Sequence, residues 1–333
     1  MKTKSKIIFG LIGVGNHAQE VIRTFPSTEY AELELLLTSS KEKVDALRSS
    51  FPDLDITSQK DDLYKHPQLS AVFITSPNSL HYQQTKECLL NHKHVISEKP
   101  LCLKASEARE LNHLAKERSL VLAENFAYRF HPQHLKVKEL LLKNVIGEPL
   151  DFKAFFHYNL QDKDNIRMQE KYNGGALSDA GCYLLDTTQY LFNEKIKSIN
   201  SNSEFHPEKN IDLETTISLV LSSGLKAELS CSMKRTRANS YVIKGTKGQI
   251  TVNNAYHVKA NQKVSIEVEN LSGEKEIIEF LGFNQLSALI DAFSRKISDS
   301  SLNFEELTDG IANAELLEQI IRKQRYLEFS GMG

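Results

Sequence analysis

A lysine stands where its charge could serve chemistry, in the segment VISEKPL, residues 95–101. Pro100 disfavours the helical conformation at the residue before it, so Lys99 should lie extended at a strand end, outside the helix that follows. An ammonium group there can stabilise negative charge on a bound oxygen and can lower the pKa of a neighbouring acid. The question is therefore which ligand this strand end faces.

A glycine motif near the N-terminus indicates a nucleotide. The segment GVGNHA, residues 13–18, follows an apolar strand, Lys6–Ile12, and leads into a helix. In this G-x-G-x-x-G/A pattern Gly13 permits the tight turn, Gly15 lets the backbone approach a pyrophosphate, and Ala18 lets the helix pack close to the strand. One such match is weak, but a second apolar strand, Leu33–Leu37, follows at the distance of a βαβ unit. A dinucleotide site is therefore favoured over a structural glycine turn.

The end of the second strand favours NADP(H) over NAD(H). An NAD-binding domain usually has an acidic residue there that binds the ribose hydroxyls. Here Thr38, Ser39 and Ser40 are small and neutral and Lys41 is cationic, which leaves room and positive charge for a 2′-phosphate. Glu42 could still turn toward the ribose, and Lys41 could be a solvated loop charge, so NAD stays the alternative.

Strands and helices continue to alternate as far as about residue 125. Repeated βα units predict a doubly wound parallel sheet with right-handed crossovers. Ligands bind such sheets outside the carboxyl ends of the strands, which places Lys99 in the cofactor crevice. The expected strands are Ala71–Thr75, His94–Ser97 and Leu120–Asn125, and the expected helices are Ser79–Leu90 and Ser106–Arg118.

The pattern changes beyond about residue 126. Apolar and polar residues alternate over Leu213–Leu221 and again over Leu225–Met233, with a Ser-Ser-Gly turn between them. This period of two predicts an antiparallel hairpin with one buried and one wetter face. We therefore expect two domains, residues 1–125 and residues 126–333.

The composition is that of a soluble globular chain of 333 residues, 40% hydrophobic and 25% charged. A net charge of −2 provides no broad basic field, so we expect a small-molecule partner and neither nucleic acid nor membrane. The glycines of the first apolar run argue against a secretory signal, and four cysteines without metal-ligand spacing fit reduced thiols, so a cytoplasmic location is expected. No metal site is expected, because His131 and His134 lack a third ligand at metal spacing.

Four motifs together resemble those of the Gfo/Idh/MocA family of glucose-fructose oxidoreductase and inositol dehydrogenase. They are SPNSLH (76–81), SEKP (97–100), ENFAYRFHPQ (124–133) and GGALSDAGCYLLD (174–186). The resemblance runs over nearly the whole chain and implies an N-terminal Rossmann domain and a C-terminal α/β domain with an open, mostly antiparallel sheet. That second domain would bind the substrate and form a homodimer or homotetramer. The implied reaction is hydride transfer between a nicotinamide cofactor and a hydroxyl or carbonyl carbon of a sugar-like compound.

The resemblance also implies roles for individual side chains. The family's catalytic lysine falls on Lys99, where an ammonium can stabilise charge developing on the substrate oxygen. Many members read Asp-x-Gly-x-His-x-x-Asp with an acid/base histidine, whereas this chain has Tyr183 at that position. A phenol can take over the proton transfer, as in the subgroup that resembles dihydrodiol dehydrogenase, xylose dehydrogenase and keto-sugar ketoreductases, although a buried core tyrosine is the alternative. Asp179 is expected to orient the substrate or the tyrosine, and Arg167 to lie near the cofactor.

The residues expected at the cofactor lie on the glycine motif, on the strand tails and in the segment before the second glycine-rich motif. They are Gly13, Gly15, Asn16, His17, Ser39, Ser40, Lys41, Thr75, Ser76, Pro77, Asn78, His81, Glu98, Lys99 and Arg167.

Two classes of function stay open. The favoured one is an NAD(P)-dependent oxidoreductase acting on CH–OH groups with Lys99 and Tyr183 as acid/base pair. A narrower form of it is a reductase of nucleotide-linked keto sugars in glycan or antibiotic biosynthesis. The rival is a non-catalytic dinucleotide-binding sensor on the same fold. Cofactor binding alone needs neither Lys99 nor Tyr183, so the presence of both favours the enzyme.

Overall fold

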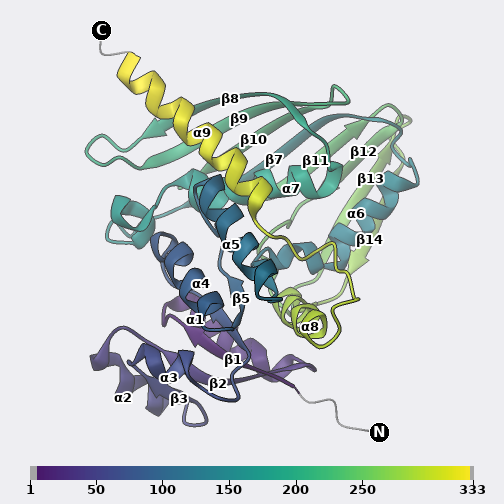
Figure 1. Ribbon diagram of the computed structural model, residues 1–333. Coiled ribbons are helices and arrows are strands. Elements are labelled where there is room, and N and C mark those ends of the chain that lie inside the picture. Colours follow the sequence, from purple (N-terminus) through teal and green to yellow (C-terminus); the bar gives the residue numbers. More distant parts are fainter. Residues whose placement is uncertain (1–5, 331–333) are drawn as a thin grey trace, which may run out of the picture. The chain divides into compact units, whose positions relative to one another are not determined.

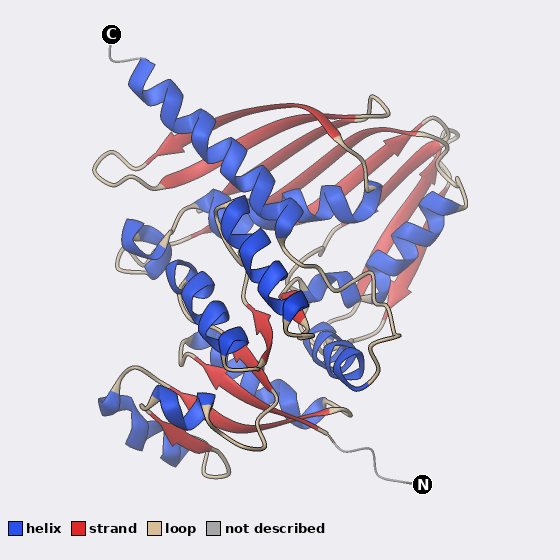
Figure 2. Ribbon diagram, in the orientation of Figure 1, coloured by secondary structure: helices blue, strands red, loops and turns tan. Residues whose placement is uncertain are grey.

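The structure is a computed structural model that describes residues 6–330, and it divides into two compact units. The first unit extends to Ala127 and also contains Leu286–Ile311. The second unit comprises Tyr128–Gln285 and the chain from Ala312 onward. Figure 1 labels their helices and strands, and Figure 2 distinguishes the two kinds of element by colour.

The first unit is built on a six-stranded sheet in the order β3-β2-β1-β4-β5-β6, in which every pair is parallel. The strands are β1 (Ile7–Ile12), β2 (Ala31–Leu37), β3 (Asp55–Thr57), β4 (Ala71–Ile74), β5 (His94–Ser97) and β6 (Leu122–Glu124). The helices are α1 (Asn16–Thr24), α2 (Lys41–Ser50), α3 (Lys60–Tyr64), α4 (His81–Leu90), α5 (Ala105–Glu117) and α8 (Gln285–Ser298), with short 3₁₀ turns η1 (Phe25–Ser27) and η2 (Asn78–Leu80). All four residues of β4 are buried, as expected for a parallel strand covered on both faces. The predicted Rossmann sheet is confirmed.

The first unit includes one segment that the sequence did not assign to it. We expected residues 126–333 to form one domain, but Leu286–Ile311 belong to the first unit. Phe293 of α8 packs against Phe9 of β1, with ring centroids 6.0 Å apart. The Asp291 carboxylate accepts hydrogen bonds from the backbone N–H groups of Glu29 (3.0 Å) and Tyr30 (2.9 Å). The apolar face of α8 is therefore buried on the N-terminal sheet, so the chain returns to the first unit after the boundary near residue 127.

The second unit is built on an eight-stranded sheet in the order β14-β13-β12-β11-β7-β10-β9-β8, shown as one broad sheet in Figure 2. Only the β7–β10 pair within it is parallel. The strands are β7 (Pro149–Asn159), β8 (Ile196–Phe205), β9 (Asp212–Leu221), β10 (Lys226–Ser232), β11 (Lys234–Gly245), β12 (Gly248–Val252), β13 (Val264–Asn270) and β14 (Lys275–Phe280). The helices are α6 (Pro132–Leu142), α7 (Cys182–Phe192) and α9 (Ile311–Ser330), with short turns η3 (Ala127–Phe130), η4 (Ile166–Met168), η5 (Glu170–Tyr172) and the π-helical η6 (Leu177–Gly181). The open, mostly antiparallel sheet is confirmed.

Helix α7 lies close to one face of this sheet, where it contacts β7 and β10. The predicted hairpin is β9–β10, and its apolar residues are buried while alternate positions such as Thr216, Ser218 and Glu228 are exposed. Gly181, just before α7, is closely packed, because a Cβ there would lie 3.0 Å from the Cys231 sulfur. This close approach places the residues of η6 and α7 directly over the sheet.

Candidate active site

The first glycine of the nucleotide motif makes a tight turn directly after β1. Gly13 has a φ of +111°, and a Cβ there would lie 2.7 Å from Thr75 Oγ1 and 2.9 Å from the Thr75 carbonyl carbon. Thr75 is held in turn by Ile12, whose carbonyl accepts hydrogen bonds from Thr75 N (2.8 Å) and Oγ1 (3.0 Å). The turn thus needs a glycine for both its conformation and its space.

The second glycine leaves open space before helix α1. A Cβ on Gly15 would meet no atom within 4 Å. No acidic residue occupies the first turn of α1, and no side chain caps its N-terminal N–H groups. Open space, uncapped N–H groups and a first helical turn without acidic residues are what a pyrophosphate requires, so these residues fit a dinucleotide cofactor.

Glu98 connects this helix with the Lys99 strand end. Its Oε1 accepts hydrogen bonds from His17 Nε2 of α1 (2.7 Å) and from the Asn125 amide after β6. The negative charge of Glu98 raises the pKa of His17 well above its usual value. Burial by itself would raise the pKa of Glu98, but the neighbouring His17 outweighs burial and the pKa is lowered. The result is a charged His17–Glu98 pair beside the Gly13–Gly15 turn.

Lys99 itself lies at the end of β5, as predicted. Its backbone N–H donates to Glu98 Oε2 (3.3 Å), and the Lys99–Pro100 peptide bond is cis. The strand ends on either side are tied to β5 by main-chain hydrogen bonds from Glu98 N to Ile74 O (2.9 Å) and from Asn125 N to Ser97 O (2.7 Å). The lysine side chain is half-buried.

His81, expected at the cofactor, is completely buried. Its Nδ1 lies 2.8 Å from Pro100 O and its Nε2 lies 2.8 Å from Ser76 O. The ring therefore lies between the Ser76 loop and the Lys99–Pro100 turn, away from any exposed surface, and in its neutral form it donates its one N–H to one of the two carbonyl groups. The nearby side chains of Thr75, Ser76, Pro77 and Asn78 are half-buried.

The residues expected to select the cofactor follow β2. Thr38 is buried, and its Oγ1 accepts a hydrogen bond from Ser40 N (3.2 Å). Ser39 and Lys41 are exposed, and Lys41 makes no ion pair with any residue that the structure describes. Glu42 is also exposed, in the first turn of α2.

In the second unit, Tyr183 lies in the first turn of α7 inside an aromatic cluster. Its ring centroid is 5.4 Å from those of Phe156, Tyr256 and His257 and 6.0 Å from that of Tyr128. Only 7% of Tyr183 is exposed, whereas His257 is exposed. The packing fixes the direction of the phenol ring, and His257 marks where the cluster reaches solvent.

Asp179 forms the centre of a second polar group in this unit. Its Oδ2 accepts a hydrogen bond from the Tyr158 hydroxyl (2.5 Å) and lies 2.9 Å from Arg167 Nε. Arg167, which was expected near the cofactor, is thus bound to Asp179. No sequence motif indicated a role for Tyr158, which lies in β7, 21 residues before Asp179.

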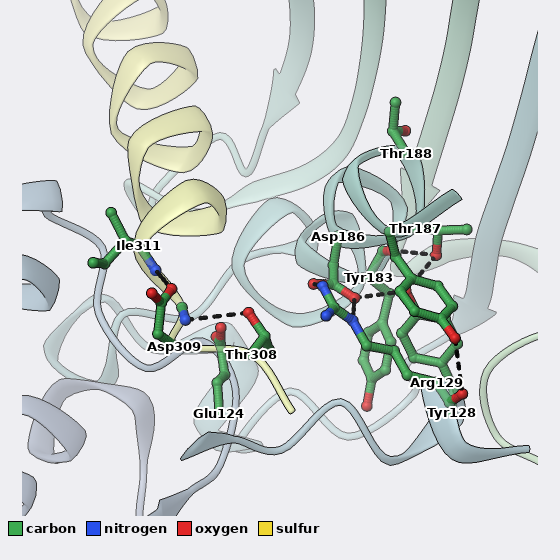
Figure 3. A network of polar contacts seen from close by, with 12 residues as sticks. Glu124, Tyr128, Arg129, Tyr183, Asp186, Thr187, Thr188, Thr308, Asp309 and Ile311 are labelled. Atoms are coloured by element: carbon green, nitrogen blue, oxygen red, sulfur yellow. Dashed lines mark hydrogen bonds and ion pairs between the residues drawn. The ribbon is translucent and has the colours of Figure 1, made fainter. Parts of the chain in front are cut away.

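A third polar group supports α7 from within the core. Figure 3 shows Arg129 and Tyr128 of η3 converging on Asp186 of α7. Arg129 Nε donates to Asp186 Oδ2 (2.9 Å), Arg129 Nη2 pairs with Oδ1 (2.5 Å), and the Tyr128 hydroxyl donates to Oδ2 (2.5 Å). The Thr187 hydroxyl donates to the Tyr183 carbonyl (2.7 Å), and its oxygen lies 3.0 Å from the Tyr128 hydroxyl oxygen. This network attaches the turn that carries Tyr183 to the chain that precedes α6.

Comparison with known proteins agrees with this two-part architecture. Residues 7–126 match the profile described as "Oxidoreductase family, NAD-binding Rossmann fold", and residues 134–251 match the "GFO/IDH/MocA C-terminal domain". The chain belongs to the Gfo/Idh/MocA family. The resemblance inferred from four motifs is confirmed, as is the prediction of an oxidoreductase with an NAD(P)-binding Rossmann domain.

Several named relatives in the Gfo/Idh/MocA family cover much of this chain. The dTDP-3,4-didehydro-2,6-dideoxy-alpha-D-glucose 3-reductase of Streptomyces violaceoruber is 28% identical over 291 residues, 86% of this chain and 84% of the relative. The enzyme of the same name from Streptomyces antibioticus is 25% identical over 96% of this chain and 98% of its own length. A trans-1,2-dihydrobenzene-1,2-diol dehydrogenase from Xenopus tropicalis is 30% identical, over 58% of each chain.

Solved structures of the Gfo/Idh/MocA family share the fold. KijD10, a 3-ketoreductase from Actinomadura kijaniata crystallised with NADP and TDP-benzene, gives a TM-score of 0.89 at 24% identity, covering 96% of this chain and 98% of KijD10. An aldose-aldose oxidoreductase from Caulobacter crescentus, crystallised with glycerol, gives 0.86 at 21% identity, covering 96% and 98% of the two chains. In the described part of this Gfo/Idh/MocA chain, no helix has the length and apolar character needed to cross a membrane.

Proposed function

We propose that the protein is an NADP(H)-dependent oxidoreductase that converts a carbonyl group of a sugar derivative to a hydroxyl, or the reverse, with Lys99 and Tyr183 as acid/base pair. The observation that carries the proposal is the buried, ring-packed Tyr183 at the family's acid/base position. A chain that only bound a dinucleotide would need neither this phenol nor the Lys99 ammonium.

The first unit supplies the cofactor site in this proposal. Gly13, Gly15 and the start of α1 would hold the pyrophosphate, with the charged His17 adding positive charge beside it. Ser39, Ser40 and Lys41 would receive a 2′-phosphate, since no acidic side chain ends β2. The nicotinamide, when bound, supplies or accepts the hydride.

In this proposal Tyr183 transfers the proton and Lys99 stabilises the negative charge. During reduction Tyr183 donates its phenolic proton to the substrate oxygen, and during oxidation it accepts that proton. The Lys99 ammonium stabilises the negative charge on the same oxygen and favours ionisation of the phenol. Asp179 lies four residues before Tyr183 and orients the substrate or the tyrosine.

The relatives favour a nucleotide-linked keto sugar as the substrate. Four of them are named dTDP-3,4-didehydro-2,6-dideoxy-alpha-D-glucose 3-reductase, and they are 25–28% identical over 80–96% of this chain. The dihydrodiol dehydrogenase match covers a smaller share, so a small cyclic diol is the second candidate.

The first test is a fluorescence titration with NADPH and NADH, because cofactor binding can be measured before the substrate is known. Tighter binding of NADPH is expected, and Lys41→Ala should remove that preference while leaving NADH binding unchanged. NADPH oxidation is then assayed with a dTDP-linked keto sugar, the free keto sugar and, in reverse with NADP, a trans-dihydrodiol. Binding without turnover of any of these would favour the sensor, and a preference for NADH would overturn the cofactor assignment.

A further inference from the structure

Arg167, Asp179 and Tyr158 form a compact polar cluster, which we call the Asp179 cluster. Both partners reach the same oxygen, because Tyr158 donates to Asp179 Oδ2 at 2.5 Å and Arg167 Nε lies 2.9 Å from it. The Asp179 side chain is only 14% exposed, whereas that of Arg167 is 42% exposed. The Asp179 carboxylate is thus mostly buried, and it is held by the partly exposed Arg167 guanidinium and by the Tyr158 hydroxyl.

The Asp179 cluster lies about one helical turn before Tyr183 in the chain. Asp179 lies in the π-helical turn η6 that continues into α7, and residues four apart on a helix lie on neighbouring positions of one face. The pKa of Arg167 is raised mainly by Asp179, and an ionised Tyr183 would raise it further. Electrostatic interaction is mutual, so the Arg167 charge favours the ionised form of Tyr183.

The two charges of the cluster act on Tyr183 in opposite directions. The Asp179 carboxylate disfavours a negative charge on Tyr183, and the Arg167 guanidinium favours one. We propose that Arg167 is a positioning residue that offsets the charge of Asp179 and so sets how readily Tyr183 exchanges its proton. This role rests on the proposed function, in which Tyr183 is the acid/base, and it differs from the expected contact of Arg167 with the cofactor.

Other groups face Tyr183 from the elements packed around it. Within the second unit the titratable ones are Tyr128 of η3, Tyr256 and His257 of the loop after β12, and Asp186 on α7 itself. Asp186 is occupied by Arg129, which neutralises its charge locally. Phe156 adds an apolar ring between Tyr183 and Tyr158. Within the second unit, a substitution in the Asp179 cluster therefore changes the charge near Tyr183 and leaves the Arg129–Asp186 pair in place.

The test measures the ionisation of Tyr183 directly, by the ultraviolet absorbance of tyrosinate during a pH titration of the whole protein. Each variant is compared with the same variant carrying Tyr183→Phe, so that the difference isolates one of 11 tyrosines. Arg167→Gln should move the Tyr183 midpoint upward by about 1 pH unit, and Asp179→Asn should move it downward by a similar amount. The double variant should return close to the unaltered protein, and Arg167→Lys, which keeps the charge, should move it little.

A matched control is Arg235→Gln. Arg235 likewise pairs with a carboxylate, that of Glu214 on β9, and among the described residues it makes no contact with Tyr183. Its removal should leave the Tyr183 midpoint unchanged. Shifts of the same sign for Arg167→Gln and Asp179→Asn, or shifts no larger than that of the control, would overturn the proposal. If Arg167→Gln fails to fold, Arg167→Lys and Asp179→Asn still give different expectations, which are no shift and a downward shift of the Tyr183 midpoint.

The absorbance titration needs neither cofactor nor substrate, so its outcome is independent of the proposed reaction. Opposite shifts without any turnover would support the effect of the Asp179 cluster on Tyr183 and would contradict the proposal that the protein is an enzyme. Turnover without any shift would support the enzyme and contradict the effect of the cluster. Where turnover is found, the pH profile of kcat/KM should move in the same direction as the absorbance midpoint, and the NADPH dissociation constant should stay the same.

Discussion

The two units hold their functional groups by different means. In the first unit the groups proposed to face a cofactor belong mostly to the main chain, at a glycine turn, a helix start and strand ends joined by backbone hydrogen bonds. In the second unit the functional side chains are held by other side chains, as in the Arg129–Asp186 and Arg167–Asp179 pairs. Substitutions at the glycine turn of the first unit should therefore act by steric clash and backbone strain. Substitutions in the second unit should act by removing or unpairing a charge.

The largest effect is expected at the proposed acid/base pair. Tyr183→Phe and Lys99→Ala should each lower kcat by about 10²–10⁴-fold, since each removes a group that exchanges or stabilises charge in the reaction. The dissociation constant of NADPH should change little in Tyr183→Phe. Steady-state kinetics with the reducible keto sugar measure kcat, and a fluorescence titration measures the dissociation constant of NADPH. Retention of half the turnover in either variant would remove that residue from the mechanism.

The next largest effect is on stability, at the buried ion pair. Asp186→Asn leaves the Arg129 guanidinium, 7% exposed, without its counter-charge. Loss of one partner of a buried pair costs about 3–5 kcal/mol of the free energy of unfolding. Urea denaturation followed by circular dichroism measures this loss.

The control for Asp186→Asn is an ion pair at the surface. Lys65 and Asp61 are 73% and 71% exposed, and Lys65→Ala should cost about 0.3–0.5 kcal/mol. Equal losses for the two variants would mean that the Arg129 pair contributes no more than a surface pair.

The two glycines of the nucleotide motif give a sharper contrast within the first unit. Gly13→Ala adds a Cβ 2.7 Å from Thr75 Oγ1 at a φ of +111°, so it should cost about 1–3 kcal/mol of stability. Gly15→Ala adds a Cβ that meets nothing within 4 Å, so the free protein should remain as stable as before. NADPH affinity should nevertheless fall in Gly15→Ala, because the added methyl occupies the space where the pyrophosphate would approach. Unfolding and NADPH titration together check this; full affinity in a stable Gly15→Ala variant would contradict the assignment.

The difference between the units also explains how far the sequence could predict them. Strand ends and the Gly13 turn depend on neighbouring residues, so apolar runs, glycines and Pro100 were enough to place them. The contacts of the second unit join distant positions: Arg129 and Asp186 are 57 residues apart, and Tyr158 and Asp179 are 21 apart. No local pattern reveals such partners. For the same reason, the sequence did not predict that Leu286–Ile311 belong to the first unit. Nor did it predict the His17–Glu98 pair, whose members are 81 residues apart.

The His17–Glu98 pair provides the smallest expected effect and one exception to the contrast between the units. The pKa of His17 is raised in the folded state, so its contribution to stability is complete below pH 6.5, its usual value, and is lost as the pH rises through the raised value. The pKa of Glu98 is lowered, so its contribution is present above pH 4.5 and is lost as the pH falls through the lowered value. His17→Gln should therefore destabilise the protein most between pH 4.5 and 6.5, by about 1 kcal/mol or less because His17 is 40% exposed, and progressively less toward pH 10. Urea midpoints at pH 5.5 and 9 test this. A loss that is independent of pH would show that His17 stabilises the turn as a neutral hydrogen-bonding group, which would remove this exception.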